Sequence, residues 1–344
     1  MDLSIIIVNW NSATFVKKCL ESIYANADGL EFEIVVVDNN SRDECQEIVE
    51  TYFPQVRFIQ SEDNLGFSGA NNLGVRYCRG RNLLFLNPDT EFLGSVMRPL
   101  SSFLDETPDA GIAGPKLLNS DMSVQTSCIA RFPSILNLTL DSEFLRRAFP
   151  TLPLWGVSPL LDDSALPVPV EVVVGACLMI KARLFETLGG FDPHYFMYAE
   201  DVDLCFSANV LGWKTYYVPS THVIHYGGCS SGVQSESHFS AIVMRESVLR
   251  FLRTKRGPAY ANFYRCLTGS AAVLRMGLLC MSLPIANKEQ RASRKIALWR
   301  WMRILRWVFG LEEWSSQLGG KTRHEEDDRH GRATVSHCAV TDKR

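Results

Sequence analysis

Short apolar runs alternate with amphipathic segments through the first third of the chain. Residues 3–8, LSIIIV, form a continuous β-branched run, which is typical of a strand buried on both faces. Similar runs occupy 33–38, 56–60 and 82–87, and the intervening segments 12–27, 43–52 and 68–78 have helical spacing. This alternation predicts an α/β fold with a mostly parallel sheet and helices on both faces.

The pattern changes after residue 114. Residues 128–170 are rich in Pro and Leu without a clear period, which predicts long loops. A strand broken at Gly175–Ala176 and leading into a helix is expected over 170–185, and another strand over 214–219. Beyond His238 the pattern is helical to about residue 310, and the charged tail from Gly319 onward is expected to be disordered.

Polar residues follow each of the four early strands. The clusters are NWNS at 9–12, DNNS at 38–41, SEDNLGFSGANN at 61–72 and NPDTE at 87–91. Ligands bind beyond the carboxyl ends of parallel strands, and those ends share one edge of the sheet. Four such clusters predict a polar crevice that binds a small molecule.

Composition narrows the classes of function. The net charge of −3 gives no general electrostatic reason to expect a nucleic acid partner. The ten cysteines lack CxxC pairs, and the first residues run directly into a strand without a signal peptide, so we expect reduced thiols in the cytoplasm. The sequence contains no uninterrupted run of 18 or more apolar residues, so we expect no membrane-spanning helix.

Three of the polar clusters offer groups suited to a nucleotide. Asp38 can accept hydrogen bonds from a base or a ribose, although an Asx turn or a helix cap is the alternative. The loop that begins at Asn64 opens into a helix whose free N–H groups suit phosphate. Asp89 is a carboxylate at the crevice edge, and Asn87 adds a neutral oxygen, a pair that suits Mg²⁺ or Mn²⁺.

Two later segments could supply catalytic groups. In AEDVDLC, residues 199–205, a helix would place Glu200 and Asp203 on one face and Asp201 elsewhere. These acids could merely complement the helix dipole, but the aromatic flank FDPHYFMY would desolvate them and favour a general base. In THVIHYGG the two histidines would point to opposite sides, and we favour His225 as a site residue over a structural one.

Taken together, these segments resemble the inverting GT-A-fold nucleotide-sugar glycosyltransferases of glycosyltransferase family 2, in the branch that includes bacterial rhamnosyltransferases. The matching pieces are SIIIVNWNS, VVVDNNSRD, NLGFSGANNLG, LFLNPDT, GACLMIKARLFETLGGFD, EDVDLCFSANVLGW and HVIHYGG, and they cover about residues 3 to 228 in the family's order. The resemblance implies a GT-A catalytic domain over 1–235, with a nucleotide-binding half (1–115) and an acceptor-binding half (116–235). A helical region over 236–314 and the disordered tail over 315–344 would follow.

The resemblance also implies residue roles. Asp201 would be the general base, with Glu200 as its neighbour and Asp203 as an alternative. Asp89 and His225 would hold a divalent cation. Asn87 stands where the family's DXD motif has an acid, which argues against a strong metal dependence. The donor would be bound by Asn9, Asp38, Asn40, Asn64, Gly66, Asn72, Asn87, Asp89, Gly175 and Ala176.

The implied reaction moves a sugar from a dTDP- or UDP-linked donor to a hydroxyl of a saccharide or lipid-linked saccharide, in cell-surface polysaccharide synthesis. The Asn-Pro-Asp form favours L-rhamnose from dTDP-rhamnose, and a UDP-hexose or UDP-N-acetylhexosamine is the alternative donor. A nucleotidyltransferase is disfavoured because no Gly-rich basic loop follows the first strand. An inactive nucleotide-sugar-binding protein is a remote alternative. Loss of the acidic residues would favour it, but these residues and His225 are all present.

The C-terminal segments bear on where the enzyme works. RASRKIALWRWMRILRWVFG, residues 291–310, is basic, amphipathic and rich in Trp, which suits an anionic membrane surface. Residues 267–284 form a second apolar segment with Arg275 near its middle. We expect peripheral contact with the inner face of the plasma membrane, and the alternatives are packing on the catalytic domain or in a homodimer.

Overall fold

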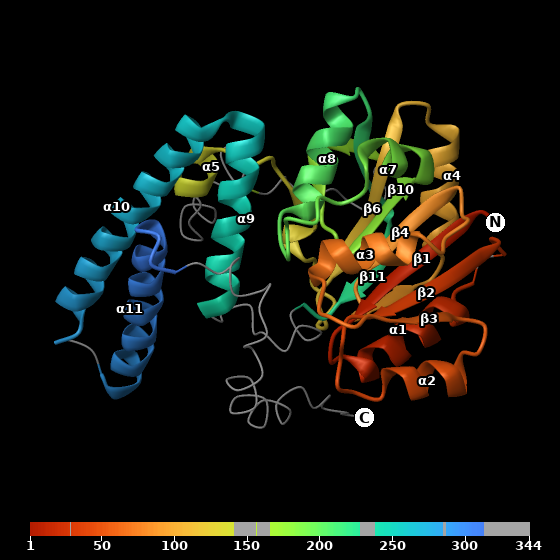
Figure 1. The fold of residues 1–344 in the computed structure, drawn as a ribbon, viewed down its shortest axis with the longest axis horizontal. Helices are drawn as coiled ribbons and strands as arrows, with labels where there is room; N and C mark the ends of the chain where they lie inside the picture. The colour runs from red at the N-terminus through yellow and green to blue at the C-terminus, as the bar shows by residue number, and fades with distance from the viewer. Residues whose placement is uncertain (28, 141–155, 157–165, 228–237, 285–286, 313–344) are drawn as a thin grey trace. The chain divides into compact units, whose positions relative to one another are not determined.

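The structure is a computed structural model that describes residues 1–27, 29–140, 156, 166–227, 238–284 and 287–312 (Figure 1). The chain divides into two compact units, Met1–Ser231 and Gly232–Arg344, and each is described by itself. The expected disordered tail over 315–344 and part of the expected long loops over 128–170 lie outside the described residues.

One large mixed sheet organises the first unit. Across it the strands run β3 (Arg57–Gln60), β2 (Phe32–Asp38), β1 (Leu3–Asn9), β4 (Asn82–Leu86), β10 (Cys177–Lys181), β6 (Ala110–Leu118), β11 (Lys214–His225) and β5 (Thr90–Leu93), and β8 (Val168–Val170) pairs with β11. The first four of these strands are parallel, whereas β10 is antiparallel to both of its neighbours. The mostly parallel α/β sheet predicted from the pattern is confirmed.

Helices cover both faces of this sheet (Figure 1). They are α1 (Ala13–Ala25), α2 (Cys45–Tyr52), α3 (Gly66–Val75), α4 (Met97–Glu106), α7 (Ala182–Leu188) and α8 (Glu200–Val210). The same unit also contains the short α5 (Ile135–Leu140). Strand β1 shows why its sequence has no polar face. Ile5 and Ile7 join the core under α1, α2 and α4, while Ile6 joins the core under α7 and α8.

The middle of the chain contains more helices and strands than the sequence pattern predicted. The 128–170 segment contains β7 (Ile129–Ala130), which pairs with β9 (Val172–Val173), and a 3-10 turn η1 (Thr126–Cys128) begins just before it. Strands β5 and β6 were not predicted at all. In β6 the sequence AGIAGPKLL carries Gly and Pro, which usually mark turns, yet all nine residues are buried between β10 and β11.

Three helices form the described part of the second unit: α9 (His238–Arg256), α10 (Pro258–Ser282) and α11 (Lys288–Val308). Helix α10 starts with Pro258 in its first turn, and the Asn287 side chain caps α11 by accepting from the Gln290 backbone N–H. Their core includes Trp307, whose indole N–H donates to Glu246. None of the helices within the described ranges is both long and apolar enough to cross a membrane.

Candidate active site

The ends of β1 and β2 carry a tightly bonded polar cluster. Asn9 and Asp38 are paired in the sheet register, and both side chains are buried. Nδ2 of Asn9 donates to Oδ1 of Asp38 at 2.7 Å, while Oδ2 of Asp38 accepts from the Ser41 backbone at 2.9 Å and from Nε2 of Gln60 at 2.8 Å. The carboxylate therefore faces neutral donors, as expected of a rigid edge for a nucleotide pocket.

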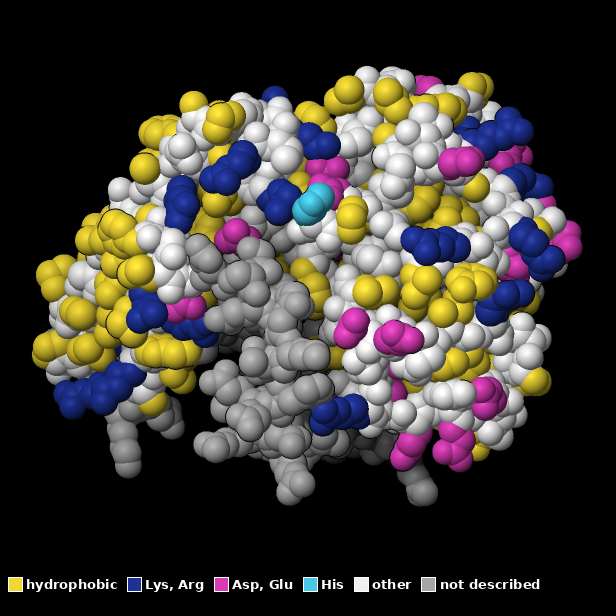
Figure 2. All heavy atoms as spheres, viewed as in Figure 1, with side chains coloured by type: hydrophobic (Ala, Val, Ile, Leu, Met, Phe, Trp, Pro, Cys, Tyr) yellow, Lys and Arg dark blue, Asp and Glu magenta, His cyan; other side chains and the backbone are white. Residues whose placement is uncertain are grey.

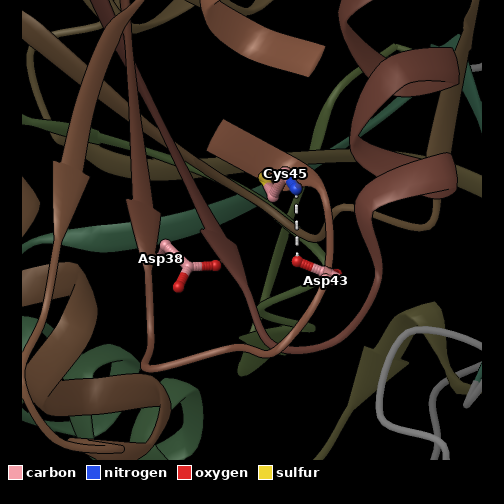
Figure 3. Close-up of side chains that lie close together, drawn as sticks. All are labelled: Asp38, Asp43 and Cys45. Carbon is pink, nitrogen blue, oxygen red and sulfur yellow. Dashed lines mark hydrogen bonds between the residues drawn. The ribbon is translucent and has the colours of Figure 1, made fainter. Parts of the chain in front are cut away.

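A second carboxylate and a thiol lie beside this cluster. Ligand atoms of Asp38, Asp43 and Cys45 all lie within 4.8 Å of one another (Figure 3). Oδ2 of Asp43 accepts from the Ala13 backbone at 2.8 Å, and its Oδ1 accepts from the Cys45 backbone at 3.3 Å. Burial, and then the charges of Asp43 and Asp38, raise the pKa of the Cys45 thiol. Both oxygens of Asp43 thus hold backbone N–H groups, which gives this carboxylate a structural role at the start of α1 and α2.

The loop before α3 is tied to the end of β2 by Asn39, which sequence reasoning missed. Its Oδ1 accepts from the Leu65 backbone at 2.8 Å, and its Nδ2 donates to Oδ1 of Asn64 at 2.9 Å. The predicted Asn40 is instead exposed, with a left-handed φ of 59°. This left-handed turn points Asn39 inward, and Asn and Asp are the residues that tolerate it.

Gly66 and Asn72 join α3 to the segment that precedes α8. A Cβ on Gly66, which has a φ of 71°, would lie 2.4 Å from the carbonyl oxygen of Phe196. Nδ2 of Asn72 donates to the Phe191 carbonyl at 2.7 Å, and its Oδ1 accepts from the Phe191 backbone N–H at 3.0 Å. Both ends of this amide thus bind backbone, and its contact with a donor stays a prediction.

A second group gathers where β4 and β11 end. The Asp89 side chain is fully buried, and its Oδ1 lies 3.6 Å from Nε2 of His225. Nδ2 of Asn87 lies 3.3 Å from the same nitrogen. The Tyr226 backbone N–H donates to the Asp89 carbonyl at 2.9 Å, which holds the two strand ends together. The predicted trio of Asn87, Asp89 and His225 is thus brought to one place.

The chemistry of this donor set fits a divalent cation. A carboxylate oxygen suits Mg²⁺ or Mn²⁺, whereas imidazole nitrogen suits transition metals, so the mixture favours Mn²⁺. The other ring nitrogen of His225, Nδ1, lies 2.9 Å from Oε1 of Gln125. Metal-binding histidines commonly have such a partner on the second nitrogen.

Gly175 and Ala176 connect this group to the acidic helix α8. The Asn87 backbone N–H donates to the Ala176 carbonyl at 2.9 Å. One residue earlier, the Gly175 backbone N–H donates to Oδ2 of Asp201 at 2.8 Å. The predicted cation ligands and the predicted base therefore lie at the same edge of the sheet.

The two acids at the start of α8 differ in accessibility and in partners. Glu200 is 7% exposed, and its Oε2 is buried without a hydrogen-bond partner. Burial, and then the charge of Asp201, raise the pKa of Glu200. Burial also raises the pKa of Asp201, against the lowering effect of backbone donors such as the Gly175 N–H. Asp201 remains partly accessible, and its raised pKa suits a general base better than the pKa of an ordinary aspartate would.

Asp203, the alternative base, lies in a different environment. Its Oδ1 accepts from the Tyr195 hydroxyl at 3.1 Å, and its Oδ2 accepts from the Ser207 hydroxyl at 3.5 Å. It is 9% exposed. These contacts favour a structural role for Asp203 and leave Asp201 as the better candidate for the base.

The backbone immediately before α8 is strained. Tyr198 and Ala199 have left-handed φ angles of 69° and 63°. A non-glycine residue in this region costs on the order of 1–2 kcal/mol. Two in succession place Glu200 and Asp201 at the first turn of the helix, a kind of strain that is often found at functional sites.

Comparison with known proteins agrees with this geometry. The model of glycosyl transferase family 2 matches residues 4–188, which is more than half of the chain and includes the polar strand ends. The chain belongs to glycosyl transferase family 2. It is a glycosyltransferase, and the resemblance seen in its motifs is confirmed.

Several relatives within this family have names that specify a sugar. The N-acetylglucosaminyl-diphospho-decaprenol L-rhamnosyltransferase of Mycobacterium tuberculosis is 28% identical over 253 residues, which cover 70% of this chain and 80% of that protein. The rhamnosyltransferase WbbL of Escherichia coli is 28% identical over 279 residues, covering 76% and 96%. The low-salt glycan biosynthesis hexosyltransferase Agl10 of Haloferax volcanii is 30% identical over 212 residues, covering 60% and 61%.

Solved structures support the fold. GalNAc-T7 with UDP, GalNAc and Mn²⁺ aligns with a TM-score of 0.55 at 15% identity, covering 90% of this chain and 57% of that one. The mannosyltransferase PcManGT of Pyrobaculum calidifontis with GDP-Man and Mn²⁺ gives 0.52 at 16% identity, covering 90% and 88%. At this identity the likeness shows the GT-A-type fold, and those two proteins bind Mn²⁺ beside a nucleotide or nucleotide sugar.

Proposed function

We propose that the chain transfers L-rhamnose from dTDP-rhamnose to a hydroxyl of a lipid-linked saccharide, with inversion at the anomeric carbon. The observation that carries the proposal is a series of contacts from Asp89 and His225 through Asn87 to the backbone of Gly175–Ala176, whose Gly175 N–H donates to Asp201. It places the proposed cation ligands and the proposed base close together. The printed names of the two rhamnosyltransferase relatives support the choice of sugar. The first of them also supports a polyprenyl diphosphate acceptor.

The reaction is a single displacement. A free lone pair of the Asp201 carboxylate takes the proton of the acceptor hydroxyl, and that oxygen forms a bond to the anomeric carbon. The bond from this carbon to the diphosphate oxygen breaks, and the nucleoside diphosphate leaves. Asp89 and His225 would hold a divalent cation, which supplies positive charge for the departing diphosphate. Glu200 stays buried beside Asp201 in the first turn of α8.

The nucleotide would be held on the other side of the crevice. Asp38 presents a carboxylate already ordered by Asn9 and Gln60, so binding a base or ribose would cost little reorganisation. Asn64 and Gly66 form the loop beside it, and Asn39 fixes that loop. These contacts are compatible with a dTDP or a UDP donor.

A hexose from a UDP-linked donor is the second candidate. The Haloferax volcanii relative with 30% identity is named as a hexosyltransferase, although this chain covers 61% of its length. A panel of donors decides between the two. The purified protein is incubated with dTDP-rhamnose, UDP-glucose or UDP-N-acetylglucosamine, each with and without a polyprenyl-diphosphate-linked N-acetylglucosamine acceptor and Mn²⁺ or Mg²⁺. The readout is acceptor-dependent release of nucleoside diphosphate.

Each outcome has a clear meaning. Turnover that requires dTDP-rhamnose and the lipid-linked acceptor supports the proposal, while turnover with a UDP-sugar replaces the donor and keeps the mechanism. Asp201→Asn should lower kcat by about 10²–10⁴-fold, whereas the neighbouring Asp203→Asn is the matched control that keeps turnover. Equal loss of activity in both variants would overturn the assignment of Asp201 as the base. No turnover with any donor would overturn the proposed transferase reaction.

The helical unit supports contact with an anionic membrane. Residues 238–312 contain 14 Lys and Arg against three Asp and Glu, whereas residues 1–227 contain 15 against 28. Figure 2 shows apolar side chains gathered over α10 and α11, with basic side chains beside them. The exposed positions recur at helical spacing along α10 and include Phe263, Cys266, Val273, Leu274, Leu278 and Met281. We name these six residues the α10 stripe.

An exposed apolar stripe on a strongly basic unit matches the surface of an anionic bilayer. Trp299 and Met302 add exposed apolar area on α11. This location would bring the enzyme to a lipid-linked acceptor at the inner face of the plasma membrane. The full chain should sediment with phosphatidylglycerol vesicles and much less with phosphatidylcholine vesicles.

The double variant Leu274→Glu with Leu278→Glu should reduce this binding about tenfold or more, because it buries charge in the interface. Val210→Glu, at a residue that is 67% exposed on α8, is the matched control and should bind like the wild type. If the double variant instead dissociates a homodimer and leaves vesicle binding unchanged, the stripe is an interface between copies of the chain and the membrane proposal fails.

A further inference from the structure

A chain of side-chain hydrogen bonds runs from the loop after β6 to His225. Oδ1 of Asp121 accepts from the Ser123 hydroxyl at 2.5 Å, and that hydroxyl oxygen accepts from Nδ2 of Asn119 at 2.9 Å. Oδ1 of Asn119 accepts from Nε2 of Gln125 at 3.2 Å. Oε1 of Gln125 then lies 2.9 Å from Nδ1 of His225.

The direction of this chain is set at its outer end. The Ser123 hydroxyl and backbone N–H both donate to Asp121, and they lower the pKa of its carboxyl group, so it remains an acceptor. The Ser123 hydroxyl donates its one proton to Asp121, so its oxygen can only accept from Asn119. A flipped Asn119 amide would bring two oxygens into contact, and a flipped Gln125 amide would do the same against Asn119.

Backbone contacts hold this chain in place. The loop is a tight turn in which the Asn119 N–H donates to the Ser123 carbonyl at 2.8 Å. The Gln125 N–H donates to the Leu117 carbonyl at 2.9 Å, which anchors it to the end of β6. Gln125 therefore has a fixed position as well as a fixed amide orientation.

We infer that Gln125 is a positioning residue that keeps the proton of the neutral His225 ring on Nδ1 and leaves the lone pair on Nε2, the ring nitrogen that lies 3.6 Å from Oδ1 of Asp89. Gln125 presents its carbonyl oxygen to Nδ1, and a carbonyl oxygen can only accept, so Nδ1 must donate. The inference rests on the cation site of the proposed function, where Nε2 is the ligand atom.

An observation on the other side of the ring agrees with this assignment. Nδ2 of Asn87, a donor, lies 3.3 Å from Nε2, which suits a nitrogen that accepts. Partners of this kind on a ligating histidine typically change metal affinity by about 10–100-fold when they are removed. Gln125 should contribute on this scale without itself touching the cation.

The tautomer can be measured in the metal-free protein. We would label the histidine rings with ¹⁵N, record two-bond ¹H–¹⁵N correlation spectra at a pH where the ring is neutral, and assign His225 by comparison with His225→Gln. In the wild type, Nδ1 should give the shift of a protonated nitrogen and Nε2 that of an unprotonated one. The opposite pattern in the wild type overturns the inference directly, without any variant.

Two variants test the cause. Gln125→Leu removes the acceptor, so it should release the tautomer preference and weaken Mn²⁺ binding, measured by titration calorimetry, by about 10–100-fold. Gln125→Glu retains an acceptor oxygen and should retain the wild-type tautomer. Gln46→Leu, an exposed glutamine on α2 that pairs with Glu50, is the matched control and should change neither readout.

Unchanged tautomer and Mn²⁺ affinity in folded Gln125→Leu would show that His225 is positioned by other contacts. The ring spectra need no donor, acceptor or turnover. A failure of rhamnosyl transfer with the expected tautomer therefore refutes the proposed function alone, and the reverse result refutes only the role of Gln125.

Discussion

The two acidic clusters at the carboxyl edge of the sheet differ in how their acids are hydrogen-bonded and desolvated. Around Asp38 the carboxylate accepts from Asn9, Gln60 and the Ser41 backbone. Around Asp201, the neighbouring Glu200 has a buried oxygen without a partner, and desolvation raises the pKa of both acids. Under the proposed function, the first cluster would bind the donor with little reorganisation, while the second would hold the base in an arrangement that lowers stability.

The backbone repeats the contrast. Near Asp38 the left-handed residue is Asn40, a type that tolerates this conformation, whereas near Asp201 the left-handed residues are Tyr198 and Ala199, which do not. In the proposed mechanism, donor binding and proton transfer would thus use clusters with different stability costs, and substitutions can test the two separately.

The largest expected effect is at Asp201. Asp201→Asn keeps the size of the side chain and the contact with the Gly175 N–H but removes the base, so kcat should fall by about 10²–10⁴-fold. Thermal stability should stay close to that of the wild type, because neutralising a desolvated acid offsets the loss of one acceptor oxygen, as Oδ1 of Asp201 also accepts from the Val202 N–H at 2.8 Å. Steady-state kinetics and a melting curve check both parts. A fall in stability with full activity would reverse the assignment of the two clusters.

Asp38→Asn should act on binding and stability together. It turns an amide group toward buried donors, so we expect a loss of about 1–3 kcal/mol of stability and a rise of about 10–100-fold in the KM for the donor. Glu33→Gln, at the other end of the same strand, is the control because Glu33 pairs with Arg79 away from the crevice. Donor KM should be unchanged in this control, and an equal rise in both variants would point to general damage to β2.

Glu200→Gln should stabilise the protein in a manner that depends on pH. Because the pKa of Glu200 is raised in the folded state, the folded protein binds the proton more tightly than the unfolded chain does. Wild-type stability therefore falls as pH rises above the ordinary glutamate range toward the raised value. The variant should gain on the order of 1 kcal/mol for each unit of pKa difference above that window, and much less at low pH.

Melting temperatures of both proteins between about pH 4 and pH 8, covering the glutamate range, provide the measurement. A gain that is constant across this range, or that shrinks as pH rises, would contradict a raised pKa of Glu200 in the native state.

The smallest expected effect concerns the strained turn. Ala199→Gly removes the steric cost of a left-handed Cβ, and the gain is partly offset by the entropy of the unfolded chain, so stability should rise by about 0.5–1 kcal/mol. Asn40→Gly is the matched change near Asp38 and should alter stability by a few tenths of a kcal/mol. Chemical denaturation of both variants measures the difference, and equal gains would remove the backbone part of the comparison.

Local patterns were sufficient for the first four strands and for most of the polar residues that follow them. The β-branched run of β1 and the Asp or Asn at each strand end follow directly from side-chain alternation and turn chemistry. The roles of Asn39 and Asn40 could not be assigned, because the left-handed φ of Asn40 decides which amide points inward. Strand β6 was missed because its Gly and Pro are accommodated by neighbours far away in the sequence, and Gln125 was missed for the same reason.

The α10 stripe also provides the protein with a natural site for chemical labelling. Cys266, on the stripe, and Cys280 near its end are exposed, whereas burial raises the pKa of Cys19, Cys45, Cys177 and Cys205 and keeps those thiols unreactive. Cys229 and Cys338 lie outside the described residues and would be replaced by serine. A polarity-sensitive maleimide dye should then couple preferentially to α10. Its emission would then report directly on whether this helix is in water or against lipid during the catalytic cycle.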